Sequence, residues 1–513
     1  MATSGLLRGG VCLLLLTGTS LVAGEEVSLV GRDAKDVTVQ LGTLEALEDG
    51  LHLFRRTRAA QFIDAYSNER YTKVPFVEQL SLYVAEGRYE DLFLAGDDAF
   101  AFEADGVFGA QTKPAPVHDG ARGGADGASC RACHFAGGPD GAGSSTQRAL
   151  TSGDGVHFAS ALVRDAPHVK GLGYVSRLAR EMEEELFATR LAAEEAALLT
   201  DAPVRFPLVA KGVSFGELWA LPGGEVDASG VEGVSPDLQI RPFGRKGRHA
   251  DLVKFADEAL QIHHGLQTAS RVSEFEGNAE LLGAGPPDDP DGDGAVVLGM
   301  YSAEYPGTEL PHAHSLLLAA YLALIGVPEI HPPRRPDLLE VWTRGRALMN
   351  EVQCTSCHVE RLWLHDDVLE LRGRGAFDTT LQLPLLEAGI EPRPRRTIFG
   401  NDDELLGVAP LFLYSDLKRH DLGPEAAEAD DEILPDGSIV PASVFLTRSL
   451  WGLADTAPYM ADGSALTVHD AILRHGGDAA PSRAAYLALA ENDRAALRVF
   501  LLSLTRTTEV LVE

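Results

Sequence analysis

The chain has 513 residues, of which 76 are acidic and 44 are Lys or Arg, so its formal net charge is −32 at pH 7. Such a surface repels nucleic acid and anionic lipid and favours cationic partners. The length allows two or three domains with hydrophobic cores, and only five cysteines are available for redox or metal chemistry.

Residues 1–24 have the pattern of an export signal. Arg8 gives a positive start, VCLLLLTGTSLV is a short apolar stretch, and VAG supplies small residues before a cleavage point near Gly24. This stretch is shorter than the ~20 residues of a spanning helix, and no later stretch reaches that length. We therefore expect a periplasmic protein with no membrane span, the alternative being an uncleaved anchor. Cleavage would remove Cys12 and leave four cysteines.

The first notable motif is C-x-x-C-H at Cys130, Cys133 and His134. It lies between the glycine-rich segments GARGGADGASC and GGPDGAGSS, which predict loops. Further along, REMEEELFATRLAAEEAALL (180–199) predicts an acidic amphipathic helix on the outside of the first domain.

Two further segments of this half contain candidate site residues. DLVKFADEALQIHHG (251–265) predicts a helix with one mainly apolar face, formed by Leu252, Phe255, Ala256, Ala259, Leu260 and His263. DDPDGDG (288–294) places Asp289, Asp291 and Asp293 like the first half of a calcium loop, although Met300 stands where its closing glutamate belongs. This segment could hold calcium or form an acidic solvated turn.

A proline-stiffened linker, HPPRRPD (331–337), divides the chain. The segment after it has apolar residues at helical spacing and runs into a second C-x-x-C-H motif at Cys354, Cys357 and His358. The last segment, ENDRAALRVFLLSLTRT, predicts a closing helix that packs against this first one. We expect a haem domain with large insertions over 25–330 and a second cytochrome c domain over 338–513.

Haem is the partner that explains every residue of the two motifs. Disulfides would need no histidine after the second cysteine, and a zinc site would leave one histidine or both unexplained. In a covalently attached haem, each cysteine adds to a vinyl group and the histidine becomes the proximal iron ligand. The sequence therefore predicts two c-type haems, with His134 and His358 as iron ligands.

At this point the chain resembles the bacterial di-haem oxidoreductase family of peroxidase-like (thiol-oxidoreductase-like) proteins, which is related to the di-haem cytochrome c peroxidases. The matching blocks are ADGVFGA, RDAPHVKGLG, RPFGRKG, DDPDGDG, SDLKRHDLG, LTRSLWGLADTAPYMADGSA and AILRHGGDA. The resemblance implies a mostly α fold with two cytochrome c-like haem domains, long loops and insertions. Family peroxidases hold calcium near the haem interface.

The resemblance also implies the function of an oxidoreductase. A peroxidase-like protein of this kind would take electrons from a small redox protein or another donor, pass them between two covalently bound haems and reduce hydrogen peroxide. Two alternatives stay open. One is a pure electron-transfer cytochrome with both irons six-coordinate and no substrate. The other is a maturation enzyme that acts on a side chain of a partner protein.

The sixth iron ligand of the C-terminal haem is expected to be His475. TVHDAILRH (467–475) predicts a helix with Thr467 as its cap and His475 at the end of its apolar face. Such a histidine could by itself be a core residue. In the related peroxidases, however, the distal ligand lies at the corresponding position as a methionine, and the resemblance therefore favours His475. Met460 is the rival ligand.

The N-terminal haem departs from the family pattern. His263 stands where relatives have an acidic catalytic residue, so it could be a distal ligand, a replacement acid–base group or a structural histidine. His264 and His157 are the alternatives. Near the C-terminal haem, Ala461 replaces a histidine that is common in relatives, and His420 keeps the family pattern and is expected to bond near a haem edge.

Overall fold

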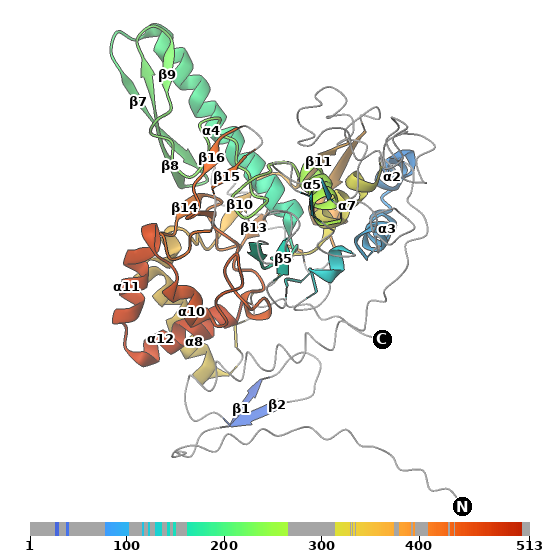
Figure 1. The fold of residues 1–513 in the computed structure, drawn as a ribbon, viewed down its shortest axis with the longest axis vertical. Coiled ribbons are helices and arrows are strands. Elements are labelled where there is room, and N and C mark those ends of the chain that lie inside the picture. The colour runs from blue at the N-terminus through green and yellow to red at the C-terminus, as the bar shows by residue number, and fades with distance from the viewer. Residues whose placement is uncertain are drawn as a thin grey trace, which may run out of the picture.

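The fold was obtained as a computed structural model (Figure 1). It describes residues 26–29, 37–40, 77–101, 115–116, 122–123, 129–135, 141–143, 147–149, 162–264, 313–328, 330, 332–333, 335–373, 379–390, 393–394, 409–428, 431–434 and 437–504. The predicted signal segment, His157 and the three aspartates of the calcium hypothesis lie outside these residues. None of the helices in this part of the chain combines the length and apolar character that crossing a bilayer requires.

A first hydrophobic core is built around α7 (Ala313–Leu324), whose sequence AHSLLLAAYLAL is apolar on nearly all sides. Such a helix must be covered all round. Three helices cover it, namely α2 (Val77–Ala85), α3 (Tyr89–Ala101) and α5 (Leu252–His264). The start of α4 (Leu172–Leu199) packs there too and buries Tyr174, Leu178 and Met182.

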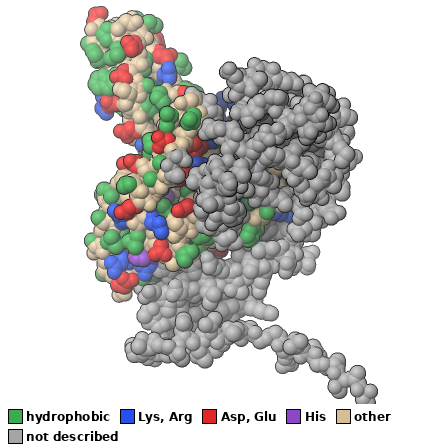
Figure 2. Space-filling view, in the orientation of Figure 1, with side chains coloured by type: hydrophobic (Ala, Val, Ile, Leu, Met, Phe, Trp, Pro, Cys, Tyr) green, Lys and Arg blue, Asp and Glu red, His purple; other side chains and the backbone are tan. Residues whose placement is uncertain are grey.

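The rest of α4 extends away from this core as an arm (Figure 1). A three-stranded antiparallel sheet packs along it, made of β7 (Val204–Ala210), β8 (Val213–Leu221) and β9 (Glu225–Asp227). The helix predicted over 180–199 is therefore confirmed, but its apolar face is covered by this sheet. Leu191, Leu198 and Leu199 stay exposed near the end of the arm, where Figure 2 shows hydrophobic side chains gathered.

A second core joins α8 (Pro336–Glu351) to α12 (Glu491–Leu502), the first and last helices of the C-terminal half. Gly345 allows the close crossing, because a Cβ at this position would lie 2.1 Å from the backbone oxygen of Ala496. Trp342 donates from its indole nitrogen to Ser503 Oγ at 2.7 Å. The predicted packing of the closing helix on the opening one is confirmed.

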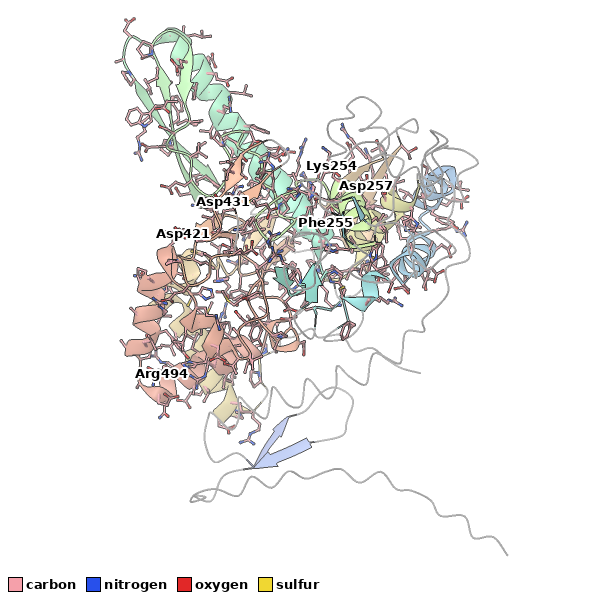
Figure 3. The ribbon with its side chains drawn as sticks, in the orientation of Figure 1. Lys254, Phe255, Asp257, Asp421, Asp431 and Arg494 are labelled. Atoms are coloured by element: carbon pink, nitrogen blue, oxygen red, sulfur yellow. The ribbon has the colours of Figure 1, made fainter. Side chains whose placement is uncertain are left out.

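Two shorter helices complete this half: α10 (Val468–Leu473) and α11 (Ala480–Ala488). The two halves can be followed in Figure 3, which labels Phe255 and Asp257 on α5 and Arg494 on α12. Strand β10 (Leu362–Leu364) pairs with β13 (Ala409–Leu411), and β11 (Val368–Arg372) pairs with β12 (Thr380–Pro384). These strands pack into the first core although they follow the linker. Whether the chain divides into domains at 331–337 stays a prediction.

Helices take up more of the described chain than strands, in line with the predicted class, but the many short hairpins were not predicted. The remaining strands are β1 (Glu26–Leu29), β2 (Val37–Gln40), β3 (Ala115–Pro116), β4 (Arg122–Gly123), β5 (Gln147–Ala149), β6 (Leu162–Arg164), β14 (Arg419–Asp421), β15 (Glu432–Ile433), β16 (Ile439–Val440) and β17 (Val444–Leu446). The short helices are η4 (Cys130–Ala132), η7 (Cys354–Ser356), α9 (Leu385–Ala388), η8 (Leu453–Asp455) and η9 (Gly477–Ala479).

Candidate functional site

The two C-x-x-C-H motifs adopt the same local structure. Each begins with a single tight turn, η4 in the first motif and η7 in the second. The backbone N–H of the histidine donates to the carbonyl of the first cysteine, at 3.0 Å for His134 and 2.9 Å for His358. The turn therefore places two sulfurs and one imidazole close together in each motif. All four cysteines are free thiols.

The first cysteine of each motif is half-buried and has a raised pKa. Burial raises the pKa of Cys130 to about 12 and that of Cys354 to about 11, with the second cysteine of each motif adding to the rise. Both thiols are therefore neutral at physiological pH, and neutral buried thiols are poor nucleophiles. An apolar environment of this kind suits an apolar partner at the sulfur better than an ion.

Both motif histidines are oriented by a backbone carbonyl. Nδ1 of His134 donates to the oxygen of Pro167, and Nδ1 of His358 donates to the oxygen of Tyr414, each at 2.9 Å. A histidine that binds a metal through one nitrogen usually donates its other N–H to such an oxygen, which fixes the ring and the tautomer. In both motifs, Nε2 is thus the nitrogen left to bind a metal.

His475 faces His358. Their ring centres are 6.4 Å apart and their planes are inclined by 51°. Two nitrogen–metal bonds of about 2 Å, plus about 1.2 Å from each nitrogen to its ring centre, would separate two axial imidazoles by roughly 6.4 Å. Nδ1 of His475 donates to the oxygen of Ala471 at 2.7 Å, so its Nε2 is also the available nitrogen.

The protonation state of this pair also suits a metal. Burial lowers the pKa of His358 to about 4, with His475 as the next cause, and burial lowers the pKa of His475 as well. Both rings are therefore neutral near pH 7, which is the form that coordinates metals. The predicted cap is confirmed, since Thr467 Oγ1 accepts from the N–H of Asp470. The helix ends at Leu473, so His475 lies just beyond it.

The histidines of α5 differ sharply in their surroundings. His263 is exposed, whereas His264 is only 5 % exposed and its Nε2 lies 3.6 Å from Cys130 Sγ. Behind it, His314 of α7 is fully buried, and burial lowers its pKa to about 4, with His264 as the second cause. The structure therefore brings His264 to the first motif, whereas His263 is exposed and its role stays a prediction.

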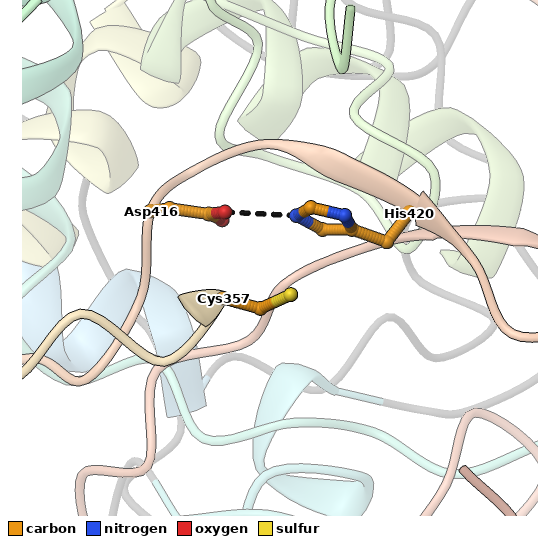
Figure 4. Close-up of side chains that lie close together, drawn as sticks. All are labelled: Cys357, Asp416 and His420. Atoms are coloured by element: carbon orange, nitrogen blue, oxygen red, sulfur yellow. Dashed lines mark hydrogen bonds and ion pairs between the residues drawn. The ribbon is translucent and has the colours of Figure 1, made fainter. Parts of the chain in front are cut away.

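His420 lies beside the second motif, as expected. Its Nε2 is 2.8 Å from Asp416 Oδ2, and the ligand atoms of Cys357, Asp416 and His420 lie within 4.8 Å of one another (Figure 4). Burial would lower the pKa of His420, but its bonds to Asp416 and Cys357 raise the pKa to about 10. Three such groups could hold a metal ion, but only if Cys357 were not committed to another group.

A backbone hydrogen bond links the segment that contains Pro167 to Ala461. The N–H of Asp165, close to Pro167 in the chain, donates to the oxygen of Ala461 at 2.9 Å. Next to it, Arg164 pairs with Glu428 at 3.2 Å. Asp165 was not singled out by sequence reasoning, and neither was His314. The only signal was that Asp165 falls in the block RDAPHVKGLG.

Comparison with known proteins identifies the C-terminal part of the chain. Residues 403–504 match the family model described as "Di-haem oxidoreductase, putative peroxidase". This range contains Tyr414, His420 and His475 but neither C-x-x-C-H motif. No curated protein matches the chain.

One similar solved structure is that of Kuenenia stuttgartiensis hydrazine synthase pressurized with 20 bar xenon. It is 13% identical, the match covers 97% of this chain and 99% of that one, and the TM-score is 0.29. A TM-score this low carries no argument about fold or function. The family match covers residues 403–504, a range that includes His475, and over this range the chain is similar to di-haem oxidoreductases.

Proposed function

We propose that the protein is a periplasmic di-haem c-type cytochrome oxidoreductase of the peroxidase type. The carrying observation is the His358–His475 pair, with ring centres 6.4 Å apart and each Nδ1 bonded to a carbonyl. This arrangement suits an iron with two imidazole ligands, and two strong ligands favour electron transfer over substrate binding. The C-terminal haem is then the electron-transfer centre, and substrate reacts at the N-terminal haem.

The residues that would hold the haems follow from the two motifs. Cys130 and Cys133 would form thioethers to one haem, with His134 as its proximal ligand. Cys354, Cys357, His358 and His475 would do the same for the second. When bound, each haem supplies a one-electron redox centre. The chain itself fixes the imidazoles by the carbonyls of Pro167, Tyr414 and Ala471.

His264 is the residue that we place in the reactive site. It is buried within 3.6 Å of Cys130 Sγ, so a molecule bound beside the first haem would lie close to Nε2. An imidazole there could move a proton from the inner to the outer oxygen of hydrogen peroxide. The haems, when bound, would supply the two electrons that, with two protons, reduce hydrogen peroxide to two water molecules. His264 thereby replaces His263 as the proposed acid–base group.

A second candidate function is a pure electron carrier, and the burial of His264 favours it. If His264 Nε2 binds the iron opposite His134, both haems are six-coordinate and no position is open for peroxide. The two functions differ in whether an added ligand can reach the first iron.

The remaining proposals concern the surroundings of the protein. Export by residues 1–24 would place the chain in the periplasm, where thiol-linked haems are attached. With a net charge of −32, the electron donor would be a small redox protein with a cationic docking face. We also propose that Asp289, Asp291 and Asp293 bind a calcium ion. The two haem domains would be divided at residues 331–337.

The test uses the full chain, exported in a host that matures c-type cytochromes. The proposal expects a Soret band, a mass increase of two haems, and cyanide-sensitive oxidation of a reduced donor by hydrogen peroxide. If cyanide changes the spectrum of neither the oxidised nor the reduced protein, and the protein does not turn over peroxide, the electron carrier is supported. A protein without a Soret band would defeat both functions.

A further inference from the structure

Arg448 combines two properties that rarely occur together. Its side chain is exposed, yet burial lowers its pKa to about 10, with repulsion from Arg245 as the second cause. A side chain can be accessible and still poorly hydrated where it borders a hollow that protein encloses. Cys354 and His358 share this combination, because both are only half-buried while burial strongly shifts the pKa of each. Arg448 is therefore accessible and yet surrounded by protein, as Cys354 and His358 are.

The backbone places Arg448 beside the support of His358. Ser415 Oγ donates to the oxygen of Thr447 at 2.8 Å, and the N–H of Leu450 donates to the oxygen of Leu413 at 3.0 Å. Residues 447–450 thus run alongside residues 413–415, which include the Tyr414 carbonyl that orients His358. Arg448 is one residue from that link.

Arg245, the charged group that acts on Arg448, already has its own carboxylate partners. Glu428 is bound by Arg245 at 2.8 Å and by Arg164 at 3.2 Å, and Glu432 is bound by Arg245 at 3.2 Å. Within the described part of the chain, no carboxylate forms an ion pair with Arg448 and no acceptor takes a hydrogen bond from it. A guanidinium keeps its charge at neutral pH even with this pKa, and a poorly hydrated charge without a counterion is costly. Among the described residues, Arg448 thus has no counterion, and an anion that is not part of these residues could supply one.

We propose that Arg448 binds a carboxylate of the bound cofactor, a propionate of the haem attached at Cys354 and Cys357. The proposal rests on the proposed haem at the second motif and goes further by assigning the residue that neutralises its charged edge. Propionates are the anionic groups of haem, and the planar fork of arginine matches a carboxylate with two parallel hydrogen bonds. Arg448 is thus a positioning residue that also tunes the iron through the charge of the propionate.

The experiment compares the reduction potentials of both haems in the holoprotein and in three variants: R448Q, R448K and R494Q. Removing the cation leaves a bare negative charge near the iron, which favours the oxidised state. R448Q should therefore lower the potential of the His475-ligated haem, by up to about tenfold in the ratio of reduced to oxidised iron, or ~59 mV. R448K keeps the positive charge but loses the planar guanidinium, so it should shift the reduction potential less than R448Q does. R494Q removes an arginine that binds Glu491 on α12, and it should give none.

The outcomes separate this proposal from the proposed function. Wild-type protein without haem would defeat the proposed function, whereas R448Q with full haem content and unchanged potentials would overturn the role of Arg448. An equal shift in R494Q would also overturn it. A shift of the wild-type potential by added sodium acetate that R448Q abolishes would show that Arg448 holds a free carboxylate and would overturn the propionate assignment. If R448Q takes up no haem, an unchanged potential in R448K contradicts the proposal.

Discussion

The ring centres of His358 and His475 lie 6.4 Å apart, although the two residues come from opposite ends of the C-terminal half. Each ring is fixed from behind by a carbonyl, Tyr414 for His358 and Ala471 for His475. Because both rings are held before any cofactor is considered, a site made by the chain alone has the spacing of two axial ligands. This pair therefore allows the sharpest tests of the proposed function.

Replacing His475 by alanine should convert one of the two haems from low-spin to high-spin. Loss of a strong axial ligand leaves the iron five-coordinate or water-bound, while the two thioethers still hold the haem. Electron paramagnetic resonance of the ferric protein measures the change. The matched control is H469A, because His469 lies on α10, six residues before His475, but bonds Tyr486 through Nδ1 at 2.8 Å. A low-spin signal that survives in H475A, or is lost equally in H469A, would contradict the assignment.

Replacing His264 by alanine should affect the N-terminal haem far more than replacing His263. His264 is buried beside Cys130, whereas His263 is exposed. If His264 acts as the acid–base group, H264A should lower peroxide turnover by a factor of about 10² to 10⁴. If it is an iron ligand, H264A should instead create a new cyanide-binding site. Steady-state turnover and cyanide difference spectra measure the two effects, and a larger effect in H263A would refute the assignment.

These two histidines also show what could be predicted from the sequence. The cap at Thr467 and the glycines after His475 are local signals, so the position of His475 followed from its neighbours. His263 and His264 are adjacent on a helix, where one residue changes direction by about 100°. The direction is decided by the packing of α5 against α7, which is distant in the sequence. The sequence pattern therefore placed His263 on the apolar face, whereas the structure buries His264.

The roles of Asp165 and Arg448 were hidden for a related reason. Neither residue belongs to a spaced motif, and a distant segment lies beside each of them: Ala461 bonds Asp165, and Ser415 bonds Thr447, the residue before Arg448. The two motif histidines, by contrast, are recognised from five consecutive residues, the C-x-x-C-H pattern. Local chemistry was thus predictable, and the charges that surround it were not.

Replacing Gly345 by valine should destabilise the C-terminal half. A Cβ there would meet the backbone oxygen of Ala496 at 2.1 Å and the Cβ of Phe500 at 2.7 Å, so α8 and α12 could not cross closely. Overpacking of this kind costs about 1–3 kcal/mol. Thermal unfolding followed by circular dichroism should show the loss. The control is E340V, which adds the same residue type at an exposed position of α8. Equal melting temperatures in both variants would show that the crossing tolerates a side chain.

The carboxyl of Asp165 should make the folded protein less stable as the pH rises. Burial, with Asp462 as the second cause, raises its pKa from an ordinary 3.8 to about 8, and its Oδ1 has no hydrogen-bond partner among the described residues. Between these two pH values the unfolded chain releases the proton while the folded protein retains it, so the stability contributed by this group declines across that window.

In D165N the amide has no proton to release, so the decline between about pH 4 and pH 8 should become shallower. Urea unfolding at a series of pH values measures the slope. The control is E340Q, which removes an exposed carboxylate from α8 and should leave the slope unchanged. The neighbouring ion pair of Arg164 with Glu428 carries charges close to Asp165, so salt should be held constant throughout. If D165N loses stability with pH as steeply as the wild type, Asp165 is ionised in the folded protein and another group causes the decline.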